Sequence, residues 1–233
     1  FLSLFSGMII PLLSIVITYG ISKLWQRFFQ VAPTHHGSFS TMFTFSNTIF
    51  IGLPINLAIF GEKAVPYVLL YYIVNTSLFW TVGIYEIARD SPSFEEAKVS
   101  FHPLVVLKKI FSPALIGFII GLIWMLFDFP LPKFIAGLGG YLSELTTPLS
   151  MFIIGMIVYY SGIKNLRMTK DLAGVLAGRF LLSPLIVWLI GQWIQVPSLM
   201  LQVFIIQASM PVQNSVPILV RNYHGDEEFA ASS

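Results

Sequence analysis

Cysteine is absent from the 233 residues of this chain, and charged residues are scarce. Without cysteine the chain has neither disulfides nor thiol chemistry. Asp, Glu, Lys and Arg make up 10% of the residues, whereas a soluble domain carries about 25%. Hydrophobic residues make up 56%, and the mean hydropathy is +0.80. A fold of this size could not cover so much apolar surface in water, so the composition excludes a soluble globular protein and indicates an all-α integral membrane protein.

Long stretches contain no Asp, Glu, Lys or Arg, and their lengths suit membrane-spanning helices. A helix needs about 20 apolar residues to cross the hydrocarbon core. The longest charge-free run, 180–220, is long enough for two spans, with a turn marked by Gln192, Gln195 and Pro197. We predict seven spans, at 1–24, 38–60, 65–88, 107–127, 134–161, 172–194 and 198–221.

The lysines and arginines are distributed unevenly between the two sides that these spans define. Ten lie in the segments 23–37, 89–109, 162–171 and 221–228, and two lie in the segments 61–64 and 128–133. Short loops rich in Lys and Arg stay in the cytoplasm. We therefore predict a multi-pass protein of the cell membrane, with Phe1 outside and the 23–37 loop, the 89–109 loop and the C-terminal end in the cytoplasm.

Two of the predicted spans carry prolines beside clustered polar residues. Span 38–60 contains Gly52-Leu-Pro54, and span 198–221 contains Pro211 and Pro217. Each proline removes a backbone donor and frees a carbonyl, which lipid tolerates only where protein or a wet cavity covers it. Paired broken helices with polar groups at mid-depth indicate the substrate site of a secondary transporter. The residues predicted to form it are Ser46, Asn47, Gly52, Pro54, Gln207, Pro211, Gln213, Asn214 and Pro217.

We expect the unwound segments 52–54 and 211–217 to cross at the membrane centre. The amino end of an interrupted helix directs positive partial charge at the gap, so an anion can bind there without a full positive charge. Plain hydrogen bonding between helices is the alternative interpretation of these polar side chains.

The two broken spans are five positions apart in the order of spans, so they run in opposite directions. Two equivalent helices that cross the membrane in opposite directions are typical of an inverted repeat. The polar stretch 89–102 is the predicted cytoplasmic linker between the two halves. Residues 1–88 would then hold three helices of the first repeat, and 103–233 would hold the second repeat without its last helix.

Three further side chains inside the predicted spans are candidates for function. Ionisable groups at membrane depth are costly and functional by default. Arg179 is either a structural counter-charge or an attractor of anionic substrate, and both interpretations stay open. For Glu144 three interpretations stay open: it pairs with a cation, it carries a coupled proton, or it lines a contact between subunits. Asn75 either faces a cavity or caps a carbonyl of a neighbouring helix.

Other polar residues suggest no chemistry. Glu62, Glu86 and Asp128 fall at predicted span ends, where we expect them to be interfacial. The adjacent pair His35 and His36 would point to different faces of a regular element, which argues against a metal site. No nucleophile–base pattern or phosphate-binding loop occurs. We therefore predict that the protein is not an enzyme, needs no cofactor or metal, and does not bind nucleic acid.

The order and spacing of several motifs resemble the auxin efflux carrier family of permeases, in its bacterial form. The motifs are Phe45-Ser-Asn-Thr-x3-Gly-Leu-Pro54, Gly61-Glu62, Ser112-Pro113, Leu131-Pro132, Thr147-Pro148-Leu149, Arg179-x4-Pro184, Gln207-Ala-x-Met-Pro211 and Tyr223-x-Gly-Asp226. The resemblance implies ten helices in two inverted repeats of five, the fold of bile-acid symporters and sodium/proton antiporters. The fourth and ninth helices would be the crossed, broken ones. Our seven spans would be helices three to nine, so we expect a fragment that lacks both ends.

The resemblance also implies a function. Family members move small organic anions such as malate, malonate or the auxin-like carboxylates, so we expect a secondary transporter that works by alternating access. Asn47 would be the crossover asparagine, and Pro54, Pro211 and Pro217 the crossover prolines. Expected partners are a small carboxylate, H+ or Na+ as coupling ion, the lipid bilayer and, in the full-length protein, a second copy in a homodimer. A channel or receptor-like helical bundle is the alternative.

Overall fold

The computed structural model describes residues 7–90, 132–145 and 168–231, with a few isolated positions between 116 and 159. Every regular element within these ranges is a helix. Three helices are long and apolar enough to cross a membrane: Ile9–Phe29, Thr48–Arg89 and Lys170–Trp193. The chain is therefore an all-α membrane protein, as its composition predicts.

The first described helix, α2 (Ile9–Phe29), continues past the end of the predicted span 1–24. The prediction of a loop over 23–37 is wrong in its first part, because Lys23 and Arg27 both lie inside the helix. Lys23 forms an ion pair with Glu86, and Arg27 lies in the last turn, where a cation is stabilised by the carboxyl end of the helix. A short 3-10 turn, η1 (Pro33–His35), follows.

The first broken helix consists of α3 (His36–Thr44), an extended break at 45–47, the π-helical turn η2 (Thr48–Gly52) and α4 (Leu53–Phe60). The predicted unwound segment 52–54 is wrong, because the backbone opens at Phe45 (φ −100°, ψ 132°) instead. Pro54 lies in the first turn of α4, where its missing N–H costs little. The π-helical turn η2 runs directly into α4, so the chain is helical through 52–54 and the break lies nearer the amino end.

Gly61, with φ 69°, turns the chain from α4 into the next helix. A left-handed φ favours glycine, because any Cβ would be strained there. The 3-10 turn η3 (Gly61–Ala64) leads into one continuous rod made of α5 (Val65–Leu78), the π-helical turn η4 (Phe79–Gly83) and α6 (Ile84–Arg89). This rod confirms the predicted span 65–88.

The second half begins with α11 (Lys170–Ala177), the π-helical turn η6 (Gly178–Leu182) and α12 (Ser183–Trp193), which together match the predicted span 172–194. The second broken helix follows as α13 (Ser198–Ala208), a non-helical break at 209–214, and α14 (Ser215–Asn222), with α15 (Glu227–Ala231) after it. Pro211 lies in the break as predicted. Pro217 does not, since it lies in the first turn of α14.

One helix of the middle region is described, α9 (Lys133–Glu144), at the start of the predicted span 134–161. The predicted span 107–127 and the linker 89–102 lie largely outside the described residues, apart from the end of α6 and Asp90 and isolated positions. The division into repeats at 1–88 and 103–233 stays a prediction.

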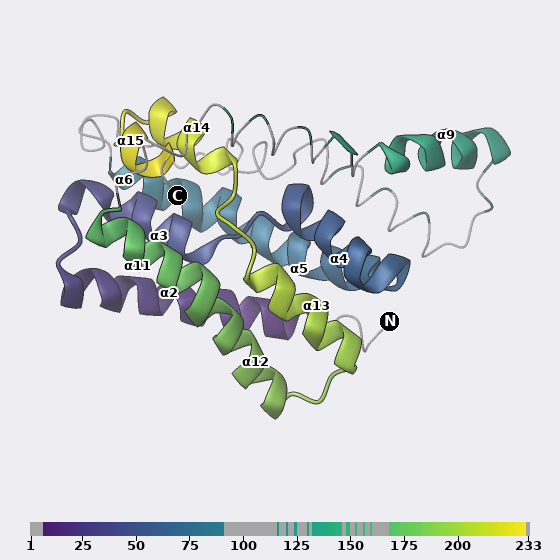
Figure 1. Ribbon diagram of the computed structural model, residues 1–233, viewed down its shortest axis with the longest axis horizontal. Coiled ribbons are helices and arrows are strands. Elements are labelled where there is room, and N and C mark those ends of the chain that lie inside the picture. The colour runs from purple at the N-terminus through teal and green to yellow at the C-terminus, as the bar shows by residue number, and fades with distance from the viewer. Residues whose placement is uncertain are drawn as a thin grey trace.

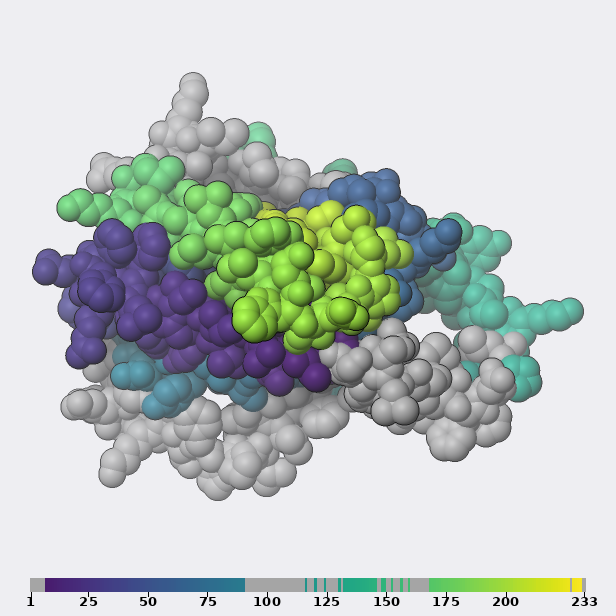
Figure 2. All heavy atoms as spheres, turned by 90° about the horizontal axis from the view of Figure 1, so that it is seen from below, coloured from purple at the N-terminus to yellow at the C-terminus, as the bar shows by residue number. Residues whose placement is uncertain are grey.

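Helix α3 lies at the centre of the described fold. Residues 37–44 are all buried, and α2, α6, α11 and α14 pack around them (Figure 1). On one face of the molecule α2, in purple, lies beside α12, in green (Figure 2). Their outward side chains are apolar and exposed, among them Leu13, Ile17 and Leu189, which is the surface that lipid requires.

Candidate functional site at the crossing of the two broken helices

The two breaks meet in space, and we call their meeting point the crossing (Figure 1). Ser46 and Val212 form an isolated antiparallel bridge. The backbone N–H of Asn47 donates to the carbonyl of Pro211 at 2.8 Å. The predicted crossing therefore exists, although on the first broken helix it uses 45–47 and not 52–54. Backbone groups that the breaks release are paired with each other.

Asn75 of α5 completes the pairing of the first break. Its Oδ1 accepts from the Ser46 N–H at 3.2 Å, and its Nδ2 donates to the Ser46 carbonyl at 2.9 Å. The side chain thus replaces the two backbone partners that Ser46 would have in a helix. Asn75 is fully buried. Of the two interpretations left open, the structure favours the one in which Asn75 caps a neighbouring backbone.

Asn47 and Asn214 join the amino ends of the two outgoing half-helices. Asn47 caps η2, because its Oδ1 accepts from the Phe50 N–H at 3.1 Å. Its Nδ2 donates to Oδ1 of Asn214 at 2.8 Å. Asn214 is itself the residue that precedes α14. Two helix amino ends, each carrying about half a positive charge, are therefore connected by one pair of asparagines.

Gln207 packs directly against the turn that leads into α4. Its Nε2 donates to the Thr48 carbonyl at 3.2 Å, and a Cβ at position 52 would lie 2.2 Å from its Oε1. A side chain at position 52 would therefore displace the Gln207 amide. Asn56, one turn further along, donates to the Gly52 carbonyl at 2.8 Å. Within the described residues, the side-chain oxygens of Ser46, Gln207 and Gln213 are buried without a hydrogen-bond partner.

Arg179 lies on the other side of the crossing and is fully buried. Its guanidinium donates to four backbone carbonyls: those of Phe43 (3.2 Å), Thr44 (2.5 Å), Ala208 (2.6 Å) and Met210 (3.3 Å). The first two carbonyls end α3, and the other two lie at the end of α13. The carboxyl ends of both incoming half-helices therefore converge on one cation.

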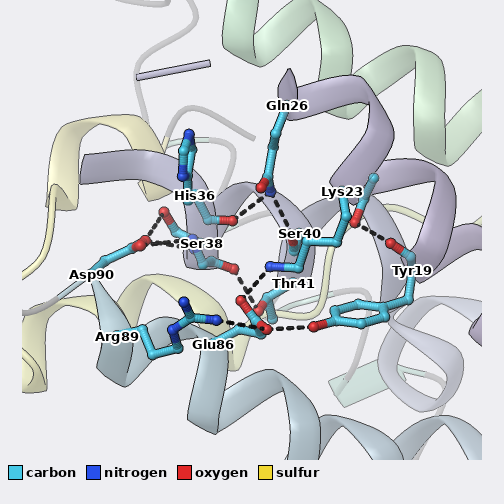
Figure 3. Close-up of polar contacts among 12 residues, drawn as sticks. Tyr19, Lys23, Gln26, His36, Ser38, Ser40, Thr41, Glu86, Arg89 and Asp90 are labelled. Atoms are coloured by element: carbon cyan, nitrogen blue, oxygen red, sulfur yellow. Dashed lines mark hydrogen bonds and ion pairs between the residues drawn. The ribbon is translucent and has the colours of Figure 1, made fainter. Parts of the chain in front are cut away.

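A second polar cluster lies between α2, α3 and α6 (Figure 3). Glu86, which we expected to be interfacial, is 3% exposed. It accepts a hydrogen bond from the Tyr19 hydroxyl, and Lys23 Nζ lies 2.5 Å from its other oxygen. Arg89 approaches at 3.8 Å. Glu86 lies near the end of its span, as expected, and its depth in the membrane stays a prediction. The sequence did not indicate its partners, Tyr19 and Lys23, which are four residues apart on one face of a helix that packs beside it.

Asp90 fixes the start of α3. Its carboxylate accepts from the backbone N–H groups of Gly37 and Ser38, each at 2.7 Å, and from the Ser38 hydroxyl at 2.8 Å. Burial raises the pKa of Asp90, and the hydrogen bonds from Ser38 and Gly37 offset only part of that rise. The carboxylate also stabilises the positive amino end of α3.

His35 ties three segments together at the same end of the molecule. Its Nδ1 lies 2.8 Å from Asp171 of α11, its Nε2 lies 3.0 Å from Asp226, and its ring stacks on Phe229 of α15. Burial lowers the pKa of His35, but the two carboxylates outweigh it, so the net shift is upward. The pKa of Asp226 is lowered, first by the hydrogen bond from the Phe229 N–H and also by His35. Among the described residues, no group of three or more His, Cys, Asp or Glu side chains is placed to hold a metal ion.

The remaining candidate, Glu144, is the last residue of α9 and is exposed. No hydrogen bond or ion pair joins it to the crossing within the described part of the chain. Sequence reasoning also missed a signal: Gly174 and Gly178 follow the spacing Gly-x3-Gly, which lets helices approach closely. Cβ atoms at these positions would lie 2.8 Å from Trp25 and 2.4 Å from Phe43, respectively.

The geometry defines a polytopic helical membrane protein whose two interrupted helices cross and share their backbone hydrogen bonds. Residues 3–232 match the family described as membrane transport protein, and the chain belongs to this family. It is the auxin efflux carrier family that the sequence motifs resemble, so that resemblance is confirmed.

Two relatives are similar to this chain over most of its length. An uncharacterized transporter of Methanocaldococcus jannaschii is 25% identical over 214 residues, which cover 90% of this chain and 66% of that protein. An uncharacterized transporter of Methanothermobacter thermautotrophicus is 27% identical over 193 residues, which cover 82% of this chain and 60% of that protein. The chain thus spans somewhat less than two thirds of the length of these relatives.

Proposed function

We propose that this protein, in its full-length form, is a secondary transporter of a small organic anion and that the anion binds at the crossing. The observation that carries the proposal is the connection of two helix amino ends through Asn47 and Asn214. Each amino end carries a partial charge of about +0.5. A carboxylate between them is stabilised by fixed dipoles and backbone N–H groups, without a lysine or arginine as its ligand.

The family and the composition of the crossing support a small carboxylate such as malate, malonate or an auxin-like acid as substrate. Asn47 and Asn214 offer amide donors, Ser46 offers a hydroxyl donor that has no partner within the described residues, and the Gln213 side chain carries an amide N–H2 as a further donor. Gly52, Pro54, Pro211 and Pro217 shape the backbone around them. We therefore keep these residues as the proposed substrate site, with alternating access as the mechanism.

The proposal extends to features of the whole transporter. We propose ten helices in two inverted repeats, a homodimer, and the orientation given by the basic loops, with Phe1 outside the cell membrane. The coupling ion is H+ or Na+. Glu144 remains the candidate for coupling, and its partner is to be sought among the segments outside the described residues.

Uptake by the full-length protein in proteoliposomes tests the proposal. With radiolabelled malate, malonate and indole-3-acetate as probes, we expect saturable uptake of at least one of them, driven by an ion gradient. Asn47→Ala removes the cap of η2 and the bond to Asn214, and one hydrogen bond to a charged group is worth about 1.5–3 kcal/mol. We therefore expect KM to rise at least about tenfold, whereas Asn222→Ala, an exposed asparagine at the end of α14, leaves uptake unchanged.

Two results would reject this assignment. Kinetics of Asn47→Ala equal to those of the parent would show that the anion binds elsewhere. Single-channel currents in a planar bilayer, with no saturation, would identify a channel in place of a transporter.

A further inference from the structure

We propose that Arg179 is a positioning residue, which joins the carboxyl ends of both incoming half-helices and thereby builds the crossing, and that it is not a ligand of the anion. The proposal rests on the anion site described above, and it assigns to Arg179, the buried cation at the crossing among the described residues, a different task from binding. It separates the two interpretations that the sequence leaves open for this residue.

The hydrogen bonds of Arg179 leave it little capacity to bind anything else. A guanidinium has five N–H donors and no acceptor. Four carbonyls, from two segments far apart in the sequence, occupy its Nε and both terminal nitrogens. The side chain is 0% exposed. In the described part of the chain no carboxylate lies within ion-pair distance of it.

The counter-charge of Arg179 comes from the helices themselves. The carboxyl end of a helix carries about −0.5 charge, and α3 and α13 both end at this side chain. Together they balance the positive charge of the guanidinium, which explains how it is buried at membrane depth without an acid. The amino ends of η2 and α14 have no such compensation among the described residues. The crossing is therefore neutral on the side of Arg179 and positive on the side of Asn47 and Asn214.

The local sequence brings Arg179 to this position. Gly174 and Gly178 let α11 and η6 lie directly on α3, because Cβ atoms there would meet the rings of Phe39 at 3.0 Å and Phe43 at 2.4 Å. Pro184 cannot donate its helical hydrogen bond, and the π-helical turn η6 that contains Arg179 ends two residues before it. The same arrangement recurs at Pro54, two residues after η2. A π-helical turn widens the helix and changes the direction of its side chains.

Lysine cannot replace arginine in this task. An ammonium group concentrates its donors at one point, whereas the planar guanidinium spreads its donors over a fork. The four carbonyls lie on two separate segments, so one ammonium group cannot hold both. For an anion ligand the opposite holds, since lysine is an established binder of carboxylates and phosphates. Arg179→Lys therefore distinguishes the two tasks.

A cross-link reports directly on the crossing. Ser46 and Val212 form an antiparallel bridge, a pairing with a Cα separation of about 4.5–5.5 Å, which suits a disulfide. The chain has no cysteine of its own. In the full-length protein carrying Ser46→Cys and Val212→Cys, we expect a mild oxidant to form the disulfide quickly in the absence of substrate. We expect the rate to fall at least about fivefold with Arg179→Gln and with Arg179→Lys, and to stay unchanged with Arg27→Gln, an exposed arginine.

The outcomes separate the task of Arg179 from the proposed function. The proposal would be overturned if Arg179→Lys and Arg179→Gln formed the cross-link at the rate of the parent. It would also be overturned if Arg179→Lys retained most of the uptake while Arg179→Gln abolished uptake. If Arg179→Gln does not fold, Arg179→Lys alone decides. Slower cross-linking together with a parent that transports none of the three carboxylates would support the positioning task and reject the proposed function.

Discussion

Asn75→Ala is the most direct test of how the first break is stabilised. The substitution removes both hydrogen bonds to the Ser46 backbone, at 3.2 and 2.9 Å, from a residue with 0% exposure beside another with 0% exposure. The Ser46 carbonyl keeps the Thr48 N–H as a partner at 3.0 Å, so one buried backbone group, the Ser46 N–H, is left unpaired, which costs about 1–3 kcal/mol. Hydrogen bonds between membrane helices average only about 0.6 kcal/mol each, which would give about 1.2 kcal/mol.

The upper part of the range for an unpaired backbone group should apply here, for a reason that the structure supplies. The smaller average describes side chains that find other partners once their bond is lost. The Ser46 N–H has no such choice, because the backbone is held extended in the break and the described residues offer this N–H no second partner. We therefore expect Asn75→Ala to lower the free energy of unfolding by at least about 2 kcal/mol.

Thermal unfolding in detergent measures the effect. For a chain of this size 1 kcal/mol corresponds to about 2–4 °C in Tm, so Asn75→Ala should lower Tm by at least about 4 °C. Gln202→Ala, an exposed amide on α13, is the matched control and should change Tm by less than about 2 °C, because exposed substitutions stay within about 0.5 kcal/mol. Equal small shifts in the two variants would refute the reasoning about unpaired backbone groups.

Two further predictions concern packing and pH. In Gly178→Ala the new Cβ would lie 2.4 Å from the buried ring of Phe43, so the free energy of unfolding should fall by about 1–3 kcal/mol. The control is Gly20→Ala, where no atom lies within 4 Å of the new Cβ, and its Tm should stay unchanged or rise. Equal Tm values for the two variants would contradict the close packing of α11 on α3. The pKa of His35 is raised above its usual 6.5 by Asp171 and Asp226, so its contribution to stability is complete below pH 6.5 and is lost as the pH rises through the higher folded-state value. Between pH 6 and pH 9, Tm of the parent should therefore fall more steeply than Tm of His35→Gln, and parallel curves would show that the ion pairs contribute nothing.

The sequence predicted the elements of this fold better than their details. Charge-free runs located the spans 65–88, 172–194 and 198–221. A helix that crosses lipid must be long and apolar, and this requirement is visible in the local composition of the sequence. The prolines and asparagines likewise indicated that 38–60 and 198–221 are broken. They did not show where the first break falls: the chain is helical through 52–54, and the break lies at 45–47.

The same limit explains the partners that were missed. The sequence places Glu86 near the end of a span, and only packing shows that Tyr19 and Lys23 of α2 reach it. Asn75 and Ser46 are 29 residues apart, so no local pattern joins them. The glycines 174 and 178 do carry a local signal, the Gly-x3-Gly spacing, which could have predicted the close approach to α3.

The sequence by itself determined that the chain lies in a membrane, that it is helical, and that two of its helices are interrupted. These properties depend on composition and on proline, which act within a few residues. Only the tertiary structure decided which atoms satisfy the interrupted backbone. The carbonyls at 43, 44, 208 and 210 accept hydrogen bonds from Arg179, and Asn47 donates to Asn214. A freed backbone group in lipid must be paired, and the fold decides which segment lies close enough to pair with it.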